Sequence, residues 1–128
     1  MDEKLFKHGA FSWFELMTSD VKAAKAFYAD LFGWELDDAP MEDMTYTVVK
    51  VNGEDVAGIM DLPPDSRGMP PAWGLYLTVD DIDATTVKAR ELGATILVEP
   101  RDIPGVGRFA VIQDPQGAWF QVMQYKQP

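Results

Sequence analysis

Residues 12–31 read SWFELMTSDVKAAKAFYADL, and residues 73–92 read WGLYLTVDDIDATTVKAREL. Each stretch opens with alternating apolar and polar residues, passes through acidic residues and closes on a leucine that lies near a glycine. Short alternation predicts a half-buried strand, and an acidic residue before a periodic segment predicts a capped helix. Both stretches therefore predict a strand followed by a helix.

The repeat continues downstream, because residues 46–60 (YTVVKVNGEDVAGIM) correspond to residues 109–123 (FAVIQDPQGAWFQVM) at nearly the same offset. Each segment predicts two strands joined by a turn. Asn52-Gly53 favours a two-residue hairpin turn, in which both residues need positive φ angles. Asp114-Pro115-Gln116-Gly117 is the matching turn of the second copy. The chain is therefore expected to use one supersecondary unit twice.

The helix boundaries and the core follow from capping and periodicity. The first helix is expected to begin after Ser19 or Asp20, to run to about Phe32 and to stop at Gly33. Its apolar face is expected to hold Val21, Ala24, Phe27, Tyr28 and Leu31. The second helix begins after Asp80 or Asp81, with apolar positions at Ile82, Val87 and Leu92. The strand residues expected in the core are Phe14, Leu16, Leu75, Leu77, Phe120 and Val122.

Residues 1–128 are expected to form a single domain, since the length suits one ordinary domain. The first module covers about residues 9–62 and the second about residues 72–126. A proline-rich segment at residues 62–71 predicts a linker between the modules, and residues 99–107 predict a loop rich in proline and glycine.

Composition excludes several classes of function. The formal net charge of −10 gives a surface that repels phosphate backbones, so no nucleic-acid partner is expected. Cysteine is absent, which excludes disulfides and a thiol nucleophile. The apolar runs are too short to span a membrane, and the N-terminus lacks the pattern of a signal peptide. We therefore expect no membrane partner and a cytoplasmic location.

Three ordered motifs resemble the vicinal oxygen chelate superfamily. They are Trp13-x-Glu15 with Phe27-Tyr28-x-x-Leu31-Phe32-Gly33-Trp34, then Val79-Asp80-Asp81-Ile82-Asp83, then Asp114-Pro115-x-Gly117 with Phe120-Gln121-Val122. This superfamily includes glyoxalase I, extradiol dioxygenases, epimerases, fosfomycin-resistance enzymes and metal-free bleomycin-binding proteins. The resemblance implies an α+β fold in which two βαβββ modules form curved mixed sheets around a cleft. It does not select one chemistry.

The resemblance also implies where a metal would be held. The corresponding positions are Trp13 and Gly74 on the first strand of each module, and Gln121 and about Gly58 on the last strands. Tryptophan and glycine offer no ligand, and an amide is a weak one. No metal site of the usual kind and no cofactor is therefore expected. The alternative is a divalent metal on atypical ligands such as His8, the sole histidine, with Glu15 and Gln121.

Strand alternation selects the candidate ligand-binding residues, which are expected on the concave face: Trp13, Glu15, Tyr76, Trp119 and Gln121. Aromatic rings and a carboxylate suit flat or cationic organic ligands. Alternatively, the aromatic residues fill a core or a dimer interface, and Glu15 reaches solvent at the rim or pairs with arginine. Trp34, Tyr46, Trp73 and Phe109 have no assigned side. Arg67 and Arg108 are either solvated or neutralise an anionic ligand.

The expected function is the metal-free binding of a small organic molecule, with homodimerisation. One alternative is a metal-dependent lyase or dioxygenase with atypical ligands, so the sequence does not decide whether the protein is an enzyme. Another is a metal-free enzyme in which Glu15 is the catalytic base. The last is a pure interaction module.

Overall fold

The computed structural model describes residues 3–41, 44–62 and 70–126. In chain order, its elements are η1 (Glu3–Phe6), β1 (Phe11–Thr18), α1 (Val21–Phe32), β2 (Glu35–Met41), β3 (Met44–Val51), β4 (Glu54–Asp61), β5 (Ala72–Thr78), α2 (Ile82–Glu91), β6 (Thr95–Ile103), β7 (Gly107–Gln113) and β8 (Trp119–Tyr125). Most of the predicted linker lies outside the described residues. No helix in the described ranges has both the length and the apolar character that a membrane span requires.

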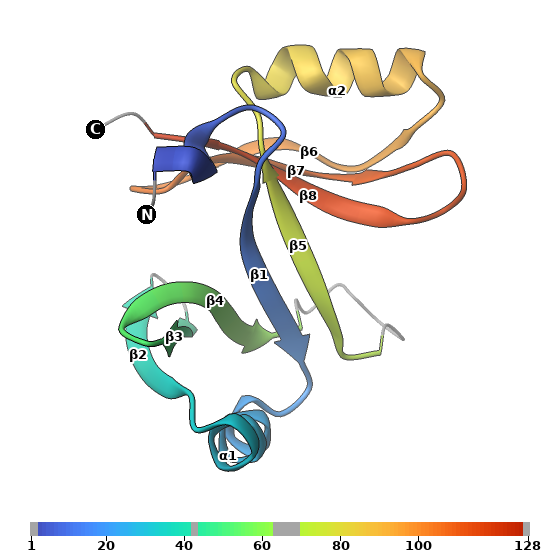
Figure 1. Cartoon of the computed structure of the whole chain (residues 1–128). Coiled ribbons are helices and arrows are strands. Elements are labelled where there is room, and N and C mark those ends of the chain that lie inside the picture. The colour runs from blue at the N-terminus through green and yellow to red at the C-terminus, as the bar shows by residue number, and fades with distance from the viewer. Residues whose placement is uncertain (1–2, 42–43, 63–69, 127–128) are drawn as a thin grey trace. The chain divides into compact units, whose positions relative to one another are not determined.

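The chain divides into two compact units. The N-terminal unit is Trp13–Gly74, and the C-terminal unit combines Met1–Ser12 with Leu75–Pro128. The path strand, helix, strand, strand, strand occurs twice and can be followed by colour in Figure 1. The strand orders are β1-β4-β3-β2 and β5-β8-β7-β6. In each unit the first strand pairs with the last in parallel, and the remaining pairs are antiparallel. The predicted α+β fold with two βαβββ modules is confirmed.

Local chemistry defines the elements of the N-terminal unit. Asp20 is the N-cap of α1, and its side chain accepts a hydrogen bond from the backbone N–H of Ala23 at 3.0 Å. Gly33 ends the helix in the left-handed conformation, with a φ of 70°. Asn52 and Gly53 both have positive φ angles, 51° and 80°, as the predicted hairpin turn requires.

The C-terminal unit repeats this scheme with different residues. Asp81 caps α2 by accepting a hydrogen bond from the backbone N–H of Ala84 at 3.1 Å. In the turn before β8, the Oδ1 atom of Asp114 accepts hydrogen bonds from the backbone N–H groups of Gln116 and Ala118. Figure 1 shows α2 lying along β6, β7 and β8. Each unit therefore has the helix N-cap and the turn that the repeat predicts for it.

Each unit has its own apolar core between its helix and its sheet. The buried core residues of the N-terminal unit are Leu16, Val49, Ala57 and Ile59. Those of the C-terminal unit are Val79, Ile82, Ala110, Ile112 and Val122. Leu77 and Phe120 pack against the second cluster, as predicted. The opposite face of each sheet, which points away from the helix, carries the remaining strand side chains.

Some predictions of core and loop were wrong. Phe14 is 45% exposed and belongs to neither core. Phe27, Leu31, Val87 and Leu92 are also exposed, because each helix packs on its sheet through a narrower stripe than its apolar content suggests. The predicted loop at residues 99–107 is mostly strand, since β6 extends to Ile103. A register shift between Val98 and Arg101 accommodates Pro100, which has no backbone N–H to donate.

Candidate functional site

A buried carboxylate lies on the face of the N-terminal sheet that points away from α1. Glu15 is only 6% exposed, and its neighbour Leu16 packs into the core on the opposite face. The Oη atom of Tyr46, on β3, donates a hydrogen bond to Oε2 of Glu15 at 2.6 Å. The Nε1 atom of Trp13 donates to the same Oη at 2.9 Å. Trp13, Tyr46 and Glu15 thus form a continuous hydrogen-bond chain, which we call the Glu15 chain.

A glycine opposite Glu15 makes room for this arrangement. Gly58 on β4 pairs with Glu15 in the parallel register of β1 and β4. It also pairs with Val48 on β3, two residues from Tyr46. A Cβ atom built on Gly58 would overlap the hydroxyl oxygen and the Cζ atom of Tyr46. The tyrosine ring therefore lies directly over the glycine, and no other residue type at position 58 would leave that space.

The hydrogen bonds of the Glu15 chain offset part of the cost of burying its carboxylate. A buried carboxylate is costly unless hydrogen bonds compensate for lost water, and the Tyr46 hydroxyl supplies one such bond. The Trp13 indole in turn polarises that hydroxyl as a donor. Such a group can anchor a cationic or hydrogen-donating ligand, or accept a proton from one.

The positions implied for a metal do not fit one. Trp13, Gly58 and Gly74 have no metal-binding atom in their side chains, and Tyr46 fills the space over Gly58. In residues 3–41, 44–62 and 70–126, no three His, Cys, Asp or Glu side chains come together as a metal-binding group. His8 is engaged elsewhere, because its Nδ1 accepts a hydrogen bond from the backbone N–H of Asp80 at 3.1 Å.

The other three candidate residues lie in the C-terminal unit. Tyr76 on β5 pairs with Gln121 on β8, and Trp119 lies two residues before Gln121 on the same face. Gln121 is 4% exposed, and its Nε2 atom has no hydrogen-bond partner among the described residues. In the same unit, Ser12 Oγ and Tyr125 Oη are 2.8 Å apart. The five predicted residues thus form two groups, one in each unit.

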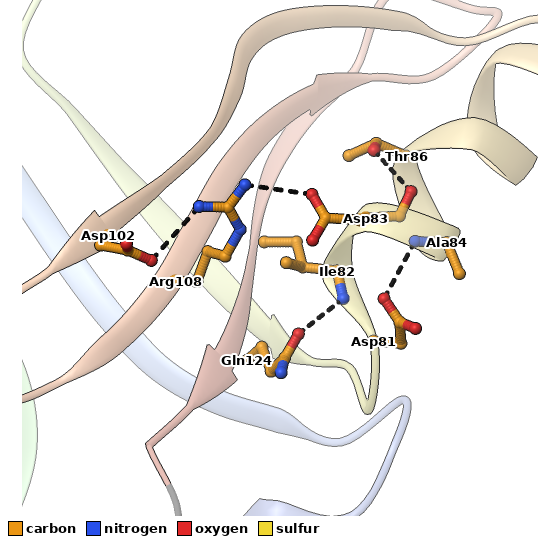
Figure 2. Close-up of polar contacts among 8 residues, drawn as sticks. All are labelled: Asp81, Ile82, Asp83, Ala84, Thr86, Asp102, Arg108 and Gln124. Atoms are coloured by element: carbon orange, nitrogen blue, oxygen red, sulfur yellow. Dashed lines mark hydrogen bonds and ion pairs between the residues drawn. The ribbon is translucent and has the colours of Figure 1, made fainter.

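Arg108 has a structural role in the C-terminal unit rather than the solvated one considered from the sequence. Its guanidinium contacts Asp83 of α2 at 3.1 Å and Asp102 of β6 at 3.2 Å (Figure 2). The hydrogen bond to Asp83, and then that to Asp102, raise the pKa of Arg108. Gln124 of β8 also accepts a hydrogen bond from the backbone N–H of Ile82 (Figure 2). These contacts hold α2 on its sheet. Arg67 lies outside the described residues.

A separate apolar groove lies on the helix side of the N-terminal unit. It has a volume of about 370 Å³ and is lined by Leu16, Thr18, Asp20, Ala23, Ala24, Phe27, Tyr28, Pro71, Ala72 and Trp73. Trp73 Nε1 donates a hydrogen bond to Tyr28 Oη at 3.1 Å. Tyr28 also stacks on Trp34, with ring centroids 5.4 Å apart. The sequence left Trp34 and Trp73 unassigned, and both belong to this aromatic cluster.

Sequence reasoning missed Tyr46, although a signal was present. Tyr46 precedes Val48 by two residues, so it shares the face of β3 that meets Gly58. A lone glycine inside a strand often marks a close approach by another group. A glycine and a tyrosine on neighbouring strands were therefore a signal that the Tyr46 ring could lie over Gly58.

Solved structures of known proteins share this fold. Methylmalonyl-CoA epimerase from Mycobacterium tuberculosis superposes with a TM-score of 0.64 at 21% identity, covering 99% of this chain and 94% of the epimerase. A variant of homoprotocatechuate 2,3-dioxygenase from B. fuscum has a TM-score of 0.62 at 18% identity, covering 91% of this chain and 32% of the dioxygenase. At such identities the similarity shows the fold alone.

Two curated relatives are more similar in sequence. CFP32 of Mycobacterium tuberculosis, named as a candidate glyoxylase, is 41% identical over 116 residues, which is 88% of this chain and 44% of the relative. The anthracycline biosynthesis protein DnrV of Streptomyces peucetius is 36% identical over 130 residues, which is 91% of this chain and 47% of the relative. The chain spans about half the length of both.

A family model supports the same assignment. The model described as the Glyoxalase/Bleomycin resistance protein/Dioxygenase superfamily matches residues 10–122, which include every element from β1 to most of β8. The two βαβββ modules, the relatives and this match agree. The chain is therefore a member of the glyoxalase/bleomycin resistance protein/dioxygenase superfamily.

Proposed function

We propose that this protein binds a small organic molecule without a metal, and that Glu15 anchors a cationic or hydrogen-donating group of the ligand. The observation that carries the proposal is the Glu15 chain, which holds a buried carboxylate with Tyr46 and Trp13. A carboxylate kept away from water interacts more strongly with a ligand cation than an exposed one does. The Trp13 ring adds a surface for stacking or for a cation–π contact.

The C-terminal unit is proposed to offer a separate set of ligand contacts of its own. Gln121 carries a buried amide nitrogen with a hydrogen bond to give, which suits an oxygen atom of a ligand. Tyr76 and Trp119 share its sheet face and offer aromatic surface. An alternative partner for the Gln121 amide is a water molecule. Replacing Gln121 with leucine is expected to lower the affinity of the protein for ligands that carry a carbonyl group.

An enzyme is the second candidate, favoured by the name of CFP32, which shares 41% identity with this chain. In that case Glu15 would move a proton, since it is a carboxylate with a tyrosine hydroxyl on one oxygen. A metal-dependent lyase or dioxygenase would need a ligand set other than Trp13, Gly58, Gly74 and Gln121. Turnover of an α-ketoaldehyde hemithioacetal or a catechol by the purified protein would establish this second candidate.

The binding proposal is tested with aromatic cations and their neutral isosteres, titrated against wild type and Glu15→Gln by calorimetry. A hydrogen bond to a charged group contributes roughly 1.5–3 kcal/mol, so the cations should lose roughly 10- to 100-fold in affinity and the neutral isosteres much less. Glu91→Gln is the matched control, because it removes the same charge at an exposed position of α2. Equal cation affinity in Glu15→Gln and wild type would refute the role of Glu15.

A homodimer and a cytoplasmic location stay predictions. Light scattering coupled to size-exclusion chromatography would give the mass in solution, which is 14.3 kDa for one chain. A mass near twice that value is expected, and it would place two sets of candidate residues in each particle.

A further inference from the structure

Resting on the proposed function, we infer that Tyr46 is a positioning residue that replaces metal coordination in the first module. Its ring lies over Gly58, which is one of the positions implied for a metal ligand, and its hydroxyl orients Glu15. In the first module, a hydrogen-bonding site that needs no metal thus occupies the implied metal position. Glu15 then contacts the ligand, while Tyr46 acts through Glu15.

The space over Gly58 is occupied by Tyr46. A side chain at position 58 would have to occupy the volume that the Tyr46 hydroxyl and Cζ now fill. The glycine and the tyrosine are therefore interdependent. A metal-binding side chain at position 58 would clash with Tyr46 in its present position. In this chain the space is taken by the tyrosine.

The two hydrogen bonds of the Glu15 chain run in one direction, from Trp13 through Tyr46 to Glu15. Trp13 has only an indole N–H to donate, so it must donate to Tyr46. The Tyr46 hydroxyl accepts that bond and donates its own hydrogen bond to Oε2 of Glu15. Trp13 from β1 and Tyr46 from β3 thus set the orientation of the Glu15 carboxylate, which strand alternation alone would not fix.

The second module serves as an internal control. At the repeated positions it has Tyr76 in place of Glu15, Gln121 in place of Gly58, and Phe109 in place of Tyr46. Phe109 has no hydroxyl, and its ring packs instead under the guanidinium of Arg101, 5.7 Å from the ring centroid. The βαβββ fold therefore forms without a tyrosine over a glycine, so this arrangement is a feature of the Glu15 site.

The experiment uses the indole N–H resonances of the four tryptophans in the 128-residue, metal-free protein. Trp13→Phe assigns the Trp13 peak by its loss. Tyr46→Phe removes one oxygen and leaves the ring, so the Trp13 peak is expected to move upfield as its hydrogen bond disappears. Glu15→Gln is expected to move the same peak in the wild-type background and to leave it in place in the Tyr46→Phe background.

Tyr28→Phe is the matched control, because Tyr28 also accepts an indole hydrogen bond, from Trp73, without contacting Glu15. It should move the Trp73 peak and leave the Trp13 peak unchanged. Gly58→Ala should reproduce the Tyr46→Phe spectrum by displacing the ring. If Gly58→Ala does not fold, the Tyr46→Phe pair still decides the matter. If neither Tyr46→Phe nor Glu15→Gln changed the chemical shift of the Trp13 peak, the inference would be overturned.

The metal part of the inference is tested with Mn²⁺ alone as the probe. Stoichiometric Mn²⁺ should leave the Trp13 peak as sharp as the Trp73 peak. Selective broadening of the Trp13 peak would show a metal beside Glu15 and would overturn the replacement of metal by Tyr46. These spectra need no organic ligand, so they can fail while the calorimetric titrations succeed, and the reverse also holds.

Discussion

At the scale of single residues, Asp38 shows how one carboxylate joins a helix to a sheet. It lies on β2, where its Oδ1 atom accepts hydrogen bonds from Lys25 of α1 at 2.9 Å and from Thr47 of β3 at 2.7 Å. The bond from Lys25, and then that from Thr47, lower the pKa of Asp38. Because the folded state favours the charged form, the stabilisation exists above the unfolded-state pKa and is lost as the pH falls through the folded-state pKa.

Replacing Asp38 with asparagine should therefore remove stability near neutral pH and change little in acid. The difference in the urea midpoint between wild type and Asp38→Asn should shrink as the pH falls below about 4, the usual value for an aspartate in an unfolded chain. Asp30→Asn on the exposed side of α1 is the control. A difference that stays constant from neutral pH into acid would contradict this origin of the stability.

The residues of the candidate site were predictable only in part. Alternation along β1 was enough to put Trp13 and Glu15 on one face. The role of Tyr46 depends on the pairing of β3 with β4, which brings Val48 opposite Gly58. Gly58 alone indicates a close approach by some group, but the bulge between Val49 and Lys50 shifts the register, so only the structure identifies that group as Tyr46. For the same reason, only the structure could show that the amide nitrogen of Gln121 has no hydrogen-bond partner in the part of the chain that it describes.

At the scale of elements, the helix boundaries were more predictable than the helix faces. Caps are local, so Asp20, Asp81 and Gly33 could be recognised from a few neighbouring residues. Which apolar residues become buried depends on the sheet beneath. Val21, Ala24 and Tyr28 pack against the first core, whereas Phe27 and Leu31 remain exposed.

Two strands escaped the sequence analysis for physical reasons. β2 has the sequence ELDDAPM, in which acidic residues and a proline interrupt the apolar alternation. It is held by its antiparallel pairing with β3, by Leu36, which packs against the first core, and by the ion pair of Asp38 with Lys25 of α1. β6 contains Pro100 and a bulge, so its pattern resembles a loop. Both are the outermost strands in the strand order of their units, where such residues are tolerated.

The two caps allow a matched test at this scale. Asp20→Ala and Asp81→Ala should each lower the free energy of unfolding by about 1 kcal/mol, since each removes one capping hydrogen bond. Both caps accept from the backbone N–H three residues onward, at 3.0 and 3.1 Å. Urea denaturation followed by circular dichroism measures the change. Asn at either position should restore most of the loss, and a failure to do so would point to a role outside capping.

At the scale of the whole molecule, the internal repeat carried most of the prediction. Strand, helix and turn signals that are weak singly occur twice in the same order, and the structure has the same strand order in both units. The repeat predicts fold better than function, since the two modules differ where chemistry would occur. Glu15 and Gly58 in one module are replaced by Tyr76 and Gln121 in the other.

Each unit should depend on its own core. Ile59 is fully buried in the N-terminal unit and Ile112 is 1% exposed in the C-terminal unit. Ile59→Ala and Ile112→Ala are each expected to cost about 2–5 kcal/mol, through lost transfer energy and the cavity left behind. Urea denaturation of both variants, with Val87→Ala on the exposed side of α2 as the control, tests this. A cost in the control as large as in the core variants would refute the assignment of the cores.

The parallel pairing of β1 with β4 also bears on when the protein acquires its site during folding. Glu15 meets Gly58 only after the helix and two intervening strands have been laid down, so the Glu15 chain is a long-range contact within its module. Such contacts require closure of a long segment and tend to form late. A nascent chain that ends before β4 lacks the partner strand of Glu15. The fluorescence of Trp13 should consequently report the closing event of the first module, after its helix has formed.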